Sequence, residues 1–297
     1  MSQNDQNGWV GSTLSDLPKS HVFTTHLPPD PLIPTPQASQ EATPQQLRVS
    51  RLVKSALFTY VAPQTSDNPQ LLVTSWKAVR DLGLNPEEVE TEEFLALMGG
   101  NKIYEEHYPW AQNYGGWQFG VWASQLGDGR AFSLFEGTNR ATGKRYELQL
   151  KGGGKTPYSR FAYPSLSPST VVVDNSDGNA VLRASIREFL ISEHLNALGI
   201  PTTRALALTV LPNRFALRER VETCAIVCRM AESWLRIGTF DLFRNRGDRE
   251  TTRKLAEYCI QHVFGEERLP AAGAGGNRFE RLYREICLRN ARTVAKW

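Results

Sequence analysis

Two short strands and the turn between them decide the fold of this chain, within AFSLFEGTNRATGKRYELQLKGG at residues 131–153. Apolar and polar side chains alternate in residues 131–139 and again in residues 145–153, a pattern typical of strands with one buried face. The intervening NRATGK supplies turn residues, so the stretch predicts an antiparallel hairpin. Lys151 then stands at the end of the second strand.

A long helix is expected after this hairpin, in AVLRASIREFLISEHLNAL (180–198). Asp177 is expected to cap its N-terminus, and Gly199 with Pro201 is expected to end it. Apolar residues at helical spacing predict that one face is buried: Leu182, Ile186, Phe189, Leu190 and Ala197.

The segments around this core have distinct patterns. TRALALTVL (203–211) and CAIVCRMA (224–231) predict two further strands, joined by a charged turn around LRERVE. Prolines and serines mark residues 163–176 as an inserted loop, and PAAGAGG (270–276) is a glycine-rich loop. TSWKAVRDLGL predicts a helix that stops at Gly83, after which Asn85-Pro86 opens the next turn.

These patterns divide the chain into four parts. Residues 1–48 are rich in Pro, Gln, Ser and Thr and predict a disordered or extended tail. Residues 49–113 are expected to form a helical cap, and residues 114–230 the sheet with its helix. The helical pattern of residues 231–297 completes an α+β chain.

Composition excludes several classes of protein. With 34 basic and 31 acidic residues the net charge is +3, without the basic block that follows a nucleic-acid backbone. Four cysteines lack the density of a disulfide scaffold and predict a reducing compartment. Cys224 and Cys228 lack the spacing of a zinc site and are expected to be buried thiols. No apolar run reaches the length of a membrane span, and the N-terminus shows neither a signal core nor a mitochondrial presequence.

Four features then follow in a meaningful order. They are the glycine-rich GGWQFGVWASQLGDGR (115–130), Lys151 at a strand end, Glu188 inside the helix, and two arginines beyond the sheet, Arg229 and Arg236. Triphosphate binding needs backbone N–H groups that approach closely, which glycine permits, and a lysine held by a helix glutamate. The order is that of a protein-kinase N-lobe.

Each feature also has an ordinary explanation. Gly127-Asp128-Gly129 is a common hairpin turn, Lys151 can be a solvated strand end, and Glu188 can pair along the helix with Arg183 or Arg187. GGGKT does not form a Walker A loop, because the motif requires glycine where Gln149 stands.

The amino-acid sequences of four segments resemble the selenoprotein O family in its fungal form. They are YGGWQFGVWASQLGDGR (114–130), LKGGGKTPYSRFA (150–162), AVLRASIREFLISEHLNALGIPTTRALAL (180–208) and CRMAESWLRIGTFDL (228–242). The resemblance implies a protein-kinase-like N-lobe, an antiparallel sheet plus a key helix, followed by the start of a helical C-lobe. It also implies ATP bound in a flipped orientation and transfer of AMP to Ser, Thr or Tyr hydroxyls of proteins.

The resemblance carries the nucleotide-binding positions onto this chain one by one. Lys151 matches the phosphate-contacting lysine that pairs with the helix glutamate, here Glu188. Asn179 departs from the arginine usual after the Asp-Gly pair, which puts one phosphate contact in doubt. The other matching positions are Gly127, Gly129, Arg130, Asp177, Gly178, Arg229 and Arg236.

The resemblance also implies what the chain does not contain. The catalytic aspartate and the Mg²⁺ ligands of the family follow a motif resembling RTVAKW, so they are expected beyond Trp297. The alternatives are a non-catalytic nucleotide-binding or partner-binding module, and a kinase that transfers phosphate. Expected partners are ATP and hydroxyl-bearing proteins, with no nucleic acid and no membrane span, and the expected location is the mitochondrion, with the cytoplasm as the alternative.

Overall fold

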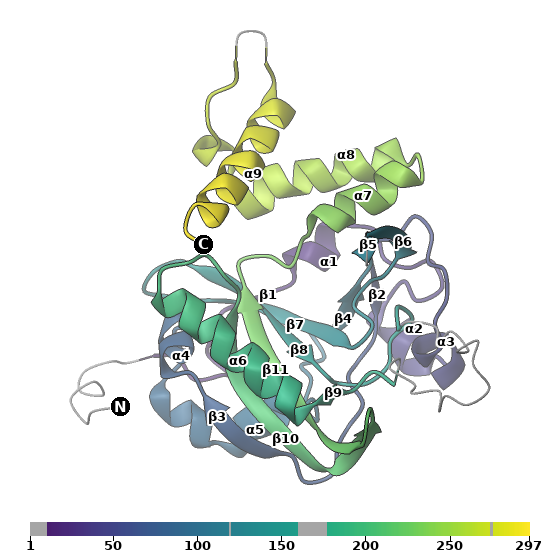
Figure 1. The fold of residues 1–297 in the computed structure, drawn as a ribbon, viewed down its shortest axis with the longest axis vertical. Coiled ribbons are helices and arrows are strands. Elements are labelled where there is room, and N and C mark those ends of the chain that lie inside the picture. Colours follow the sequence, from purple (N-terminus) through teal and green to yellow (C-terminus); the bar gives the residue numbers. More distant parts are fainter. Residues whose placement is uncertain (1–10, 119, 160–176, 274–275) are drawn as a thin grey trace.

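The computed structural model describes residues 11–118, 120–159, 177–273 and 276–297 (Figure 1). The expected insertion at 163–176 and part of the glycine-rich loop at 270–276 lie outside the described residues.

One large antiparallel sheet organises the molecule, with strand order β2-β4-β7-β8-β11-β10-β3; β1 joins at β7 and β9 at β11. Two further strands, β5 and β6, form a separate hairpin. The strands are β1 (Lys19–Ser20), β2 (Phe58–Tyr60), β3 (Gln70–Thr74), β4 (Trp110–Gln112), β5 (Gly115–Gln118), β6 (Val121–Gln125), β7 (Ala131–Thr138), β8 (Arg145–Lys151), β9 (Ala180–Val181), β10 (Arg204–Leu217) and β11 (Val221–Ala231).

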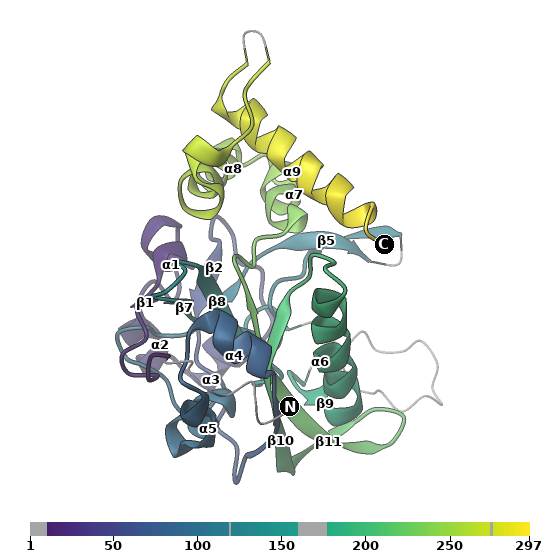
Figure 2. The same ribbon diagram turned by 90° about the vertical axis from the view of Figure 1, so that its left-hand side faces the viewer.

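Helices cover both faces of this sheet and one end of it (Figures 1 and 2). The short helices are η2 (Pro86–Glu90), the π-helix η3 (Cys259–Phe264) and η4 (Glu266–Arg268). The α-helices are α1 (Val22–His26), α2 (Pro36–Glu41), α3 (Pro44–Arg48), α4 (Trp76–Leu82), α5 (Glu92–Met98), α6 (Leu182–Ala197), α7 (Ile237–Asn245), α8 (Arg249–Tyr258) and α9 (Arg278–Val294).

The predicted hairpin and the two further predicted strands are confirmed. β7 pairs with β8 across the turn at 139–144, and β10 pairs with β11 across the charged turn near Arg218. The helix predicted in TSWKAVRDLGL is α4, which ends at Gly83 in the left-handed conformation, and Asn85 caps η2 after it.

Side-chain alternation along β11 separates the faces of the sheet. Ile226, Cys228 and Met230 pack with α4 and α5 in the main core, whereas Ala225 and Val227 pack under α6. Since alternate residues of a strand face opposite sides, the side chains of Arg229 and of its partner on β8, Gln149, lie on the α6 side of the sheet.

Helix α6 confirms the predicted helix but not its cap or its whole face. The N-cap is Val181, without a side-chain hydrogen bond, because the Asp177 carboxylate is held by Arg218. Phe189 is buried as expected, while Leu190 is 61% exposed and Ala197 is also exposed.

Two serines occupy the buried positions of α6 instead. Ser185 and Ser192 face the sheet, and each hydroxyl donates a hydrogen bond to a carbonyl one turn earlier in the helix. A serine satisfied in this way can be buried at low cost, which a hydrophobic pattern does not register.

The prediction of a disordered or extended tail is wrong for residues 11–48, and residues 1–10 are outside the described residues. This segment forms three helices and β1, and it buries apolar side chains in three clusters of the core. Phe23, for example, stacks on Trp110 with ring centroids 4.3 Å apart. The fully or nearly fully buried residues are Leu14, Leu17, Phe23, Leu27, Ile33 and Leu47.

The last elements gather at one end of the sheet, with α7 and α8 side by side and α9 crossing beside them (Figures 1 and 2). We call α7, α8, η3 and α9 the helical end. Phe23 of α1 packs with Leu242, Phe243 and Tyr258, so the N-terminal segment joins the sheet to the helical end. No helix among the described residues combines the length and the apolar character that a bilayer crossing requires.

Candidate functional site

A cavity of about 660 Å³ opens on the α6 side of the sheet. Tyr114, Leu126 and Tyr158 contribute to its walls, and Asp128 is the acidic residue among those that line it. Seven of the residues that the sequence singled out line this cavity: Gly127, Gly129, Arg130, Lys151, Gly178, Arg229 and Arg236.

A partly buried ion-pair network stands at the centre of this site. The Lys151 Nζ donates to Glu188 Oε2 at 2.5 Å, and Arg229 Nη1 donates to Glu188 Oε1 at 3.0 Å. Lys151 comes from the end of β8, Arg229 from β11, where it pairs with Gln149 of β8, and Glu188 from α6. The helix carboxylate therefore holds two cations from neighbouring strands, so the alternative of a pair along the helix surface is wrong.

Burial and charge act on this network in opposite directions. Burial raises the pKa of Glu188, whereas the charges and hydrogen bonds of Lys151 and Arg229 lower it. Their combined effect outweighs burial, so the pKa lies below its ordinary value. Burial and the nearby Arg229 lower the pKa of Lys151 in spite of Glu188. Two cations that share one carboxylate leave positive charge at the cavity wall, where an anionic ligand is stabilised.

Gln149 and Asp128 extend the network and were not among the predicted site residues. Gln149 Oε1 accepts from Arg229 at 2.6 Å, and Gln149 Nε2 donates to Asp128 Oδ2 at 3.1 Å. Asp128, only 3% exposed, also accepts from Arg236 at 3.3 Å. Period-two alternation on β8 places Gln149 on the face of Lys151, which is the signal in the sequence that would have found it.

Arg236 connects the cavity to the helical end. It lies between β11 and α7, where its Nη1 donates to Gln112 at 2.9 Å. Its guanidinium stacks 4.2 Å from the centroid of the Tyr114 ring, and Arg229 stacks in the same way on Trp234 at 4.4 Å. Both arginines are thereby held in fixed orientations, which lowers the entropy lost when they bind a ligand.

Gly127 and Gly129 are required for packing. Gly127 has φ +67°, and a Cβ there would stand 2.5 Å from the Tyr158 side chain. At Gly129 a Cβ would stand 2.8 Å from the Tyr158 carbonyl oxygen. The GDG turn therefore lies flat against residues 156–159 and keeps its backbone at the cavity wall.

Asp177 does not line the cavity, in contrast to its neighbour Gly178. Arg218 binds both oxygens of the Asp177 carboxylate at 2.9 Å, and the Asn179 N–H donates to the same group. Asp177 thus positions Arg218, which lines the cavity from the turn between β10 and β11. The Asn179 carbonyl accepts from Arg130 at 2.9 Å, so this position contributes its backbone to the site.

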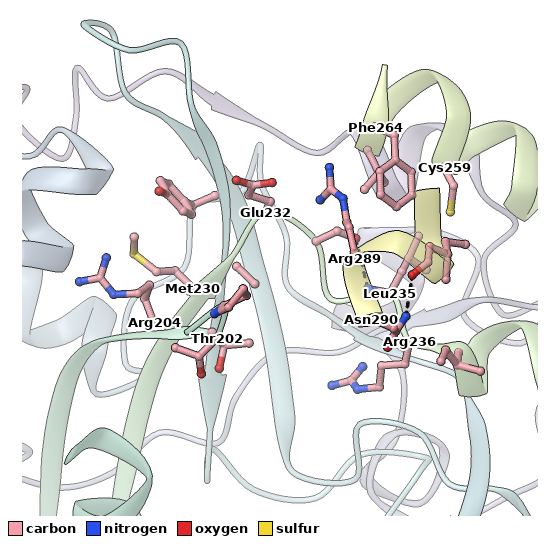
Figure 3. Close-up of a pocket in the computed structure, with 18 of the residues that line it drawn as sticks. Thr202, Arg204, Met230, Glu232, Leu235, Arg236, Cys259, Phe264, Arg289 and Asn290 are labelled. Carbon is pink, nitrogen blue, oxygen red and sulfur yellow. Dashed lines mark hydrogen bonds between the residues drawn. The ribbon is translucent and has the colours of Figure 1, made fainter. Parts of the chain in front are cut away.

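A second cavity, of about 700 Å³, lies between the sheet and the helical end (Figure 3). In Figure 3, Arg204 and Met230 from the sheet, with Thr202 just before β10, stand opposite Phe264 and Arg289. Arg204 is held by Glu193 and Asp81, and Arg289 by Glu285. Within the part of the chain that the structure describes, Arg236 is the only predicted site residue that lines this second cavity. The first cavity is therefore the candidate functional site.

A family model and several curated proteins match this chain. The family model described as protein adenylyltransferase SelO matches residues 48–297. A mitochondrial protein adenylyltransferase SelO of Schizosaccharomyces pombe is 52% identical over 290 residues, which cover 97% of this chain and 48% of that protein. Protein nucleotidyltransferases YdiU of Xanthomonas campestris and Methylobacillus flagellatus are 43% and 41% identical over 82% and 86% of this chain.

The chain spans about half the length of the curated relatives it matches, 48%, 44% and 47% of the three proteins named. The matched region contains the cavity, the ion-pair network and both arginines that stack on aromatic rings. This chain belongs to the protein adenylyltransferase SelO family.

Proposed function

We propose that this chain is the ATP-binding part of a protein adenylyltransferase. The observation that carries the proposal is the convergence of glycines, a lysine and arginines from distant parts of the chain on one cavity, around the Lys151–Glu188–Arg229 network. In this proposal the sheet with α6 corresponds to a kinase N-lobe, and the helical end is the start of a C-lobe.

Each residue of the network has a role in the proposal. Lys151, Arg229 and Arg236 hold phosphate oxygens, and Arg130 adds charge beside the glycine turn. Glu188 keeps Lys151 and Arg229 in place, as the helix glutamate does in protein kinases. Guanidinium groups suit this task because they bind phosphate oxygens through two parallel hydrogen bonds.

The proposed reaction transfers AMP to the hydroxyl of a Ser, Thr or Tyr side chain in a protein. The hydroxyl oxygen forms a bond to the α-phosphorus, the bond from that phosphorus to the bridging oxygen breaks, and pyrophosphate leaves with the electron pair. The hydroxyl proton goes to a general base, a role that we assign to none of the described residues. Fixed cations around the phosphates stabilise the charge that moves onto the leaving group.

Mg²⁺ is expected to accompany ATP, but the described residues do not offer a ligand set for it. Asp128 already accepts from Gln149 and Arg236, and Glu188 accepts from Lys151 and Arg229. We therefore assign no step to the metal, and its protein ligands remain outside the described residues in this proposal.

The mitochondrion is the proposed location. It is supported by the printed name of the Schizosaccharomyces pombe relative, which is described as mitochondrial. Proposed partners are ATP and proteins that present a hydroxyl side chain.

Calorimetric titration of the chain with ATP tests the nucleotide site. Lys151→Met should weaken ATP binding by about tenfold or more, because a charge-assisted hydrogen bond to a phosphate contributes about 1.5–3 kcal/mol. Lys77→Met, an exposed lysine on α4, is the matched control and should leave the affinity unchanged. Absence of ATP binding by the unmodified chain would contradict the proposal.

The transferred group is tested separately, with the chain joined to the remaining length that its relatives have. ATP labelled at the α-phosphate should label acceptor proteins, and ATP labelled at the γ-phosphate should not. Label from the γ-phosphate alone would identify a kinase instead.

A further inference from the structure

Seven cationic side chains line the cavity, and most of them have a carboxylate partner. Glu188 binds Lys151 and Arg229, and Asp128 binds Arg236. The remaining two pairs of this kind are Arg218 with Asp177 and Arg183 with Glu222.

Arg187 differs from these residues. It lies on α6 one turn after Arg183 and directly before Glu188, and its side chain is exposed and lines the cavity. Within the part of the chain that the structure describes, its guanidinium has neither an ion pair nor a hydrogen bond.

An unpaired arginine beside other cations raises the free energy of the empty protein, because like charges repel at short range. Arg183 stands four residues away on the same helix, which is a spacing at which like charges destabilise a helix. A bound polyanion reverses this effect, since it is attracted by Arg187 and screens it from its neighbours. Such a charge therefore favours a phosphorylated ligand over a neutral one.

We propose that Arg187 contacts the polyphosphate of the bound nucleotide and makes the cavity prefer ATP over unphosphorylated adenosine. The inference rests on the proposed function, because it assigns a further residue to the same nucleotide site. The family resemblance did not assign this residue, and its spacing predicted it only as a partner along the helix for Glu188.

The test compares three ligands on the chain of 297 residues: ATP, inorganic tripolyphosphate and adenosine. In Arg187→Gln the dissociation constants for ATP and for tripolyphosphate should each rise about tenfold, as expected for loss of a charge-assisted contact with phosphate. The dissociation constant for adenosine should not change. The dependence of ATP affinity on salt concentration should also become weaker, because one exposed charge has been removed.

Two further variants separate this role from a structural one. Arg187→Lys keeps the charge but loses the planar fork, so its ATP affinity should lie between those of the wild type and Arg187→Gln. Arg249→Gln removes an exposed arginine from the first turn of α8, away from this cavity, and should leave all three constants unchanged.

The outcomes are distinguishable. If the wild type binds none of the ligands, both the proposed function and this inference are overturned. If the wild type binds ATP and Arg187→Gln binds it equally well, or loses adenosine in the same proportion, the inference alone is overturned.

Discussion

At the scale of single residues, Glu147 is a buried acid on the α6 face of β8, next to the network. It is 4% exposed, and its carboxylate accepts from Ser133 at 2.7 Å. Burial raises its pKa to about 8, opposed by the Ser133 hydrogen bond and assisted by Glu136, its partner across the strands, and by Asp128. Glu147 is therefore protonated at neutral pH, as a hydrogen-bonded neutral acid.

This proton makes stability depend on pH. The unfolded chain loses the proton near pH 4.5 and the folded chain near pH 8, so between these values the folded state binds more protons. The free energy of unfolding should fall as pH rises through this window, by up to about 1.4 kcal/mol per pH unit from this group. Glu147→Gln cannot titrate, so urea unfolding at pH 6 and pH 8 should show a smaller pH dependence.

The control for this prediction is Glu250→Gln, which removes an exposed carboxylate from α8. It should keep the pH dependence of the wild type. An equal pH dependence in Glu147→Gln and the wild type would show that Glu147 is already ionised in the folded protein.

Gly127 allows a second prediction at this scale, because the chain offers a matched control. Gly127 and Gly143 both have φ +67°, but a Cβ at Gly143 meets no atom within 4 Å. Gly143→Ala should lower the free energy of unfolding by about 1–2 kcal/mol, the cost of the left-handed conformation. Gly127→Ala should cost about 1–3 kcal/mol more, because Tyr158 must also move. Equal losses in urea unfolding would contradict this account.

At the scale of elements, α1 has only five residues, yet it contacts both the sheet and the helical end. Phe23 contacts Trp110 and Phe58 of the sheet and Tyr258 of the helical end. The element therefore stabilises the junction that positions Arg236 between the sheet and α7.

Truncation of this contact should be costly. Phe23 is 1% exposed, so Phe23→Ala should lower the free energy of unfolding by about 3–5 kcal/mol, from lost burial and the cavity that remains. Leu32→Ala, at an exposed position of the same segment, should change it by less than about 0.5 kcal/mol. Chemical denaturation of both variants is the measurement. A small loss in Phe23→Ala would mean that residues 11–48 pack independently of the rest.

At the scale of the whole molecule, the proposed nucleotide cavity is lined by the sheet, α6, the GDG turn and the segment before α7. A ligand that binds these parts together stabilises all of them relative to the unfolded chain. ATP at 100 times its dissociation constant should raise the free energy of unfolding by about 2.7 kcal/mol.

Scanning calorimetry with and without ATP measures this effect. A single transition that shifts to higher temperature is expected, because α1 and Arg236 connect the helical end to the sheet. Two transitions of which only one shifts would show that the helical end unfolds as a separate unit.

The sequence by itself determined the secondary structure around the site and the order of its parts. Alternation predicted the β7–β8 hairpin, and two further strands were expected on either side of a charged turn. The position of Lys151 at a strand end and of Glu188 in a helix made them candidates for the ion pair that they form. These features follow from local periodicity, which neighbouring residues in the chain decide. The family resemblance added Arg130 and Gly178 to Gly127, Gly129, Arg229 and Arg236, and all six residues share one cavity with Lys151.

Only the tertiary structure decided the partners that come from far along the chain. Arg218 takes Asp177 away from the helix cap, Asp128 joins Arg236 across 108 residues, and residues 11–48 fold because the sheet buries their scattered apolar side chains. A proline-rich segment with little apolar surface cannot form a core alone, yet it can complete one that already exists. Such pairings depend on distances in space, which composition and spacing do not encode.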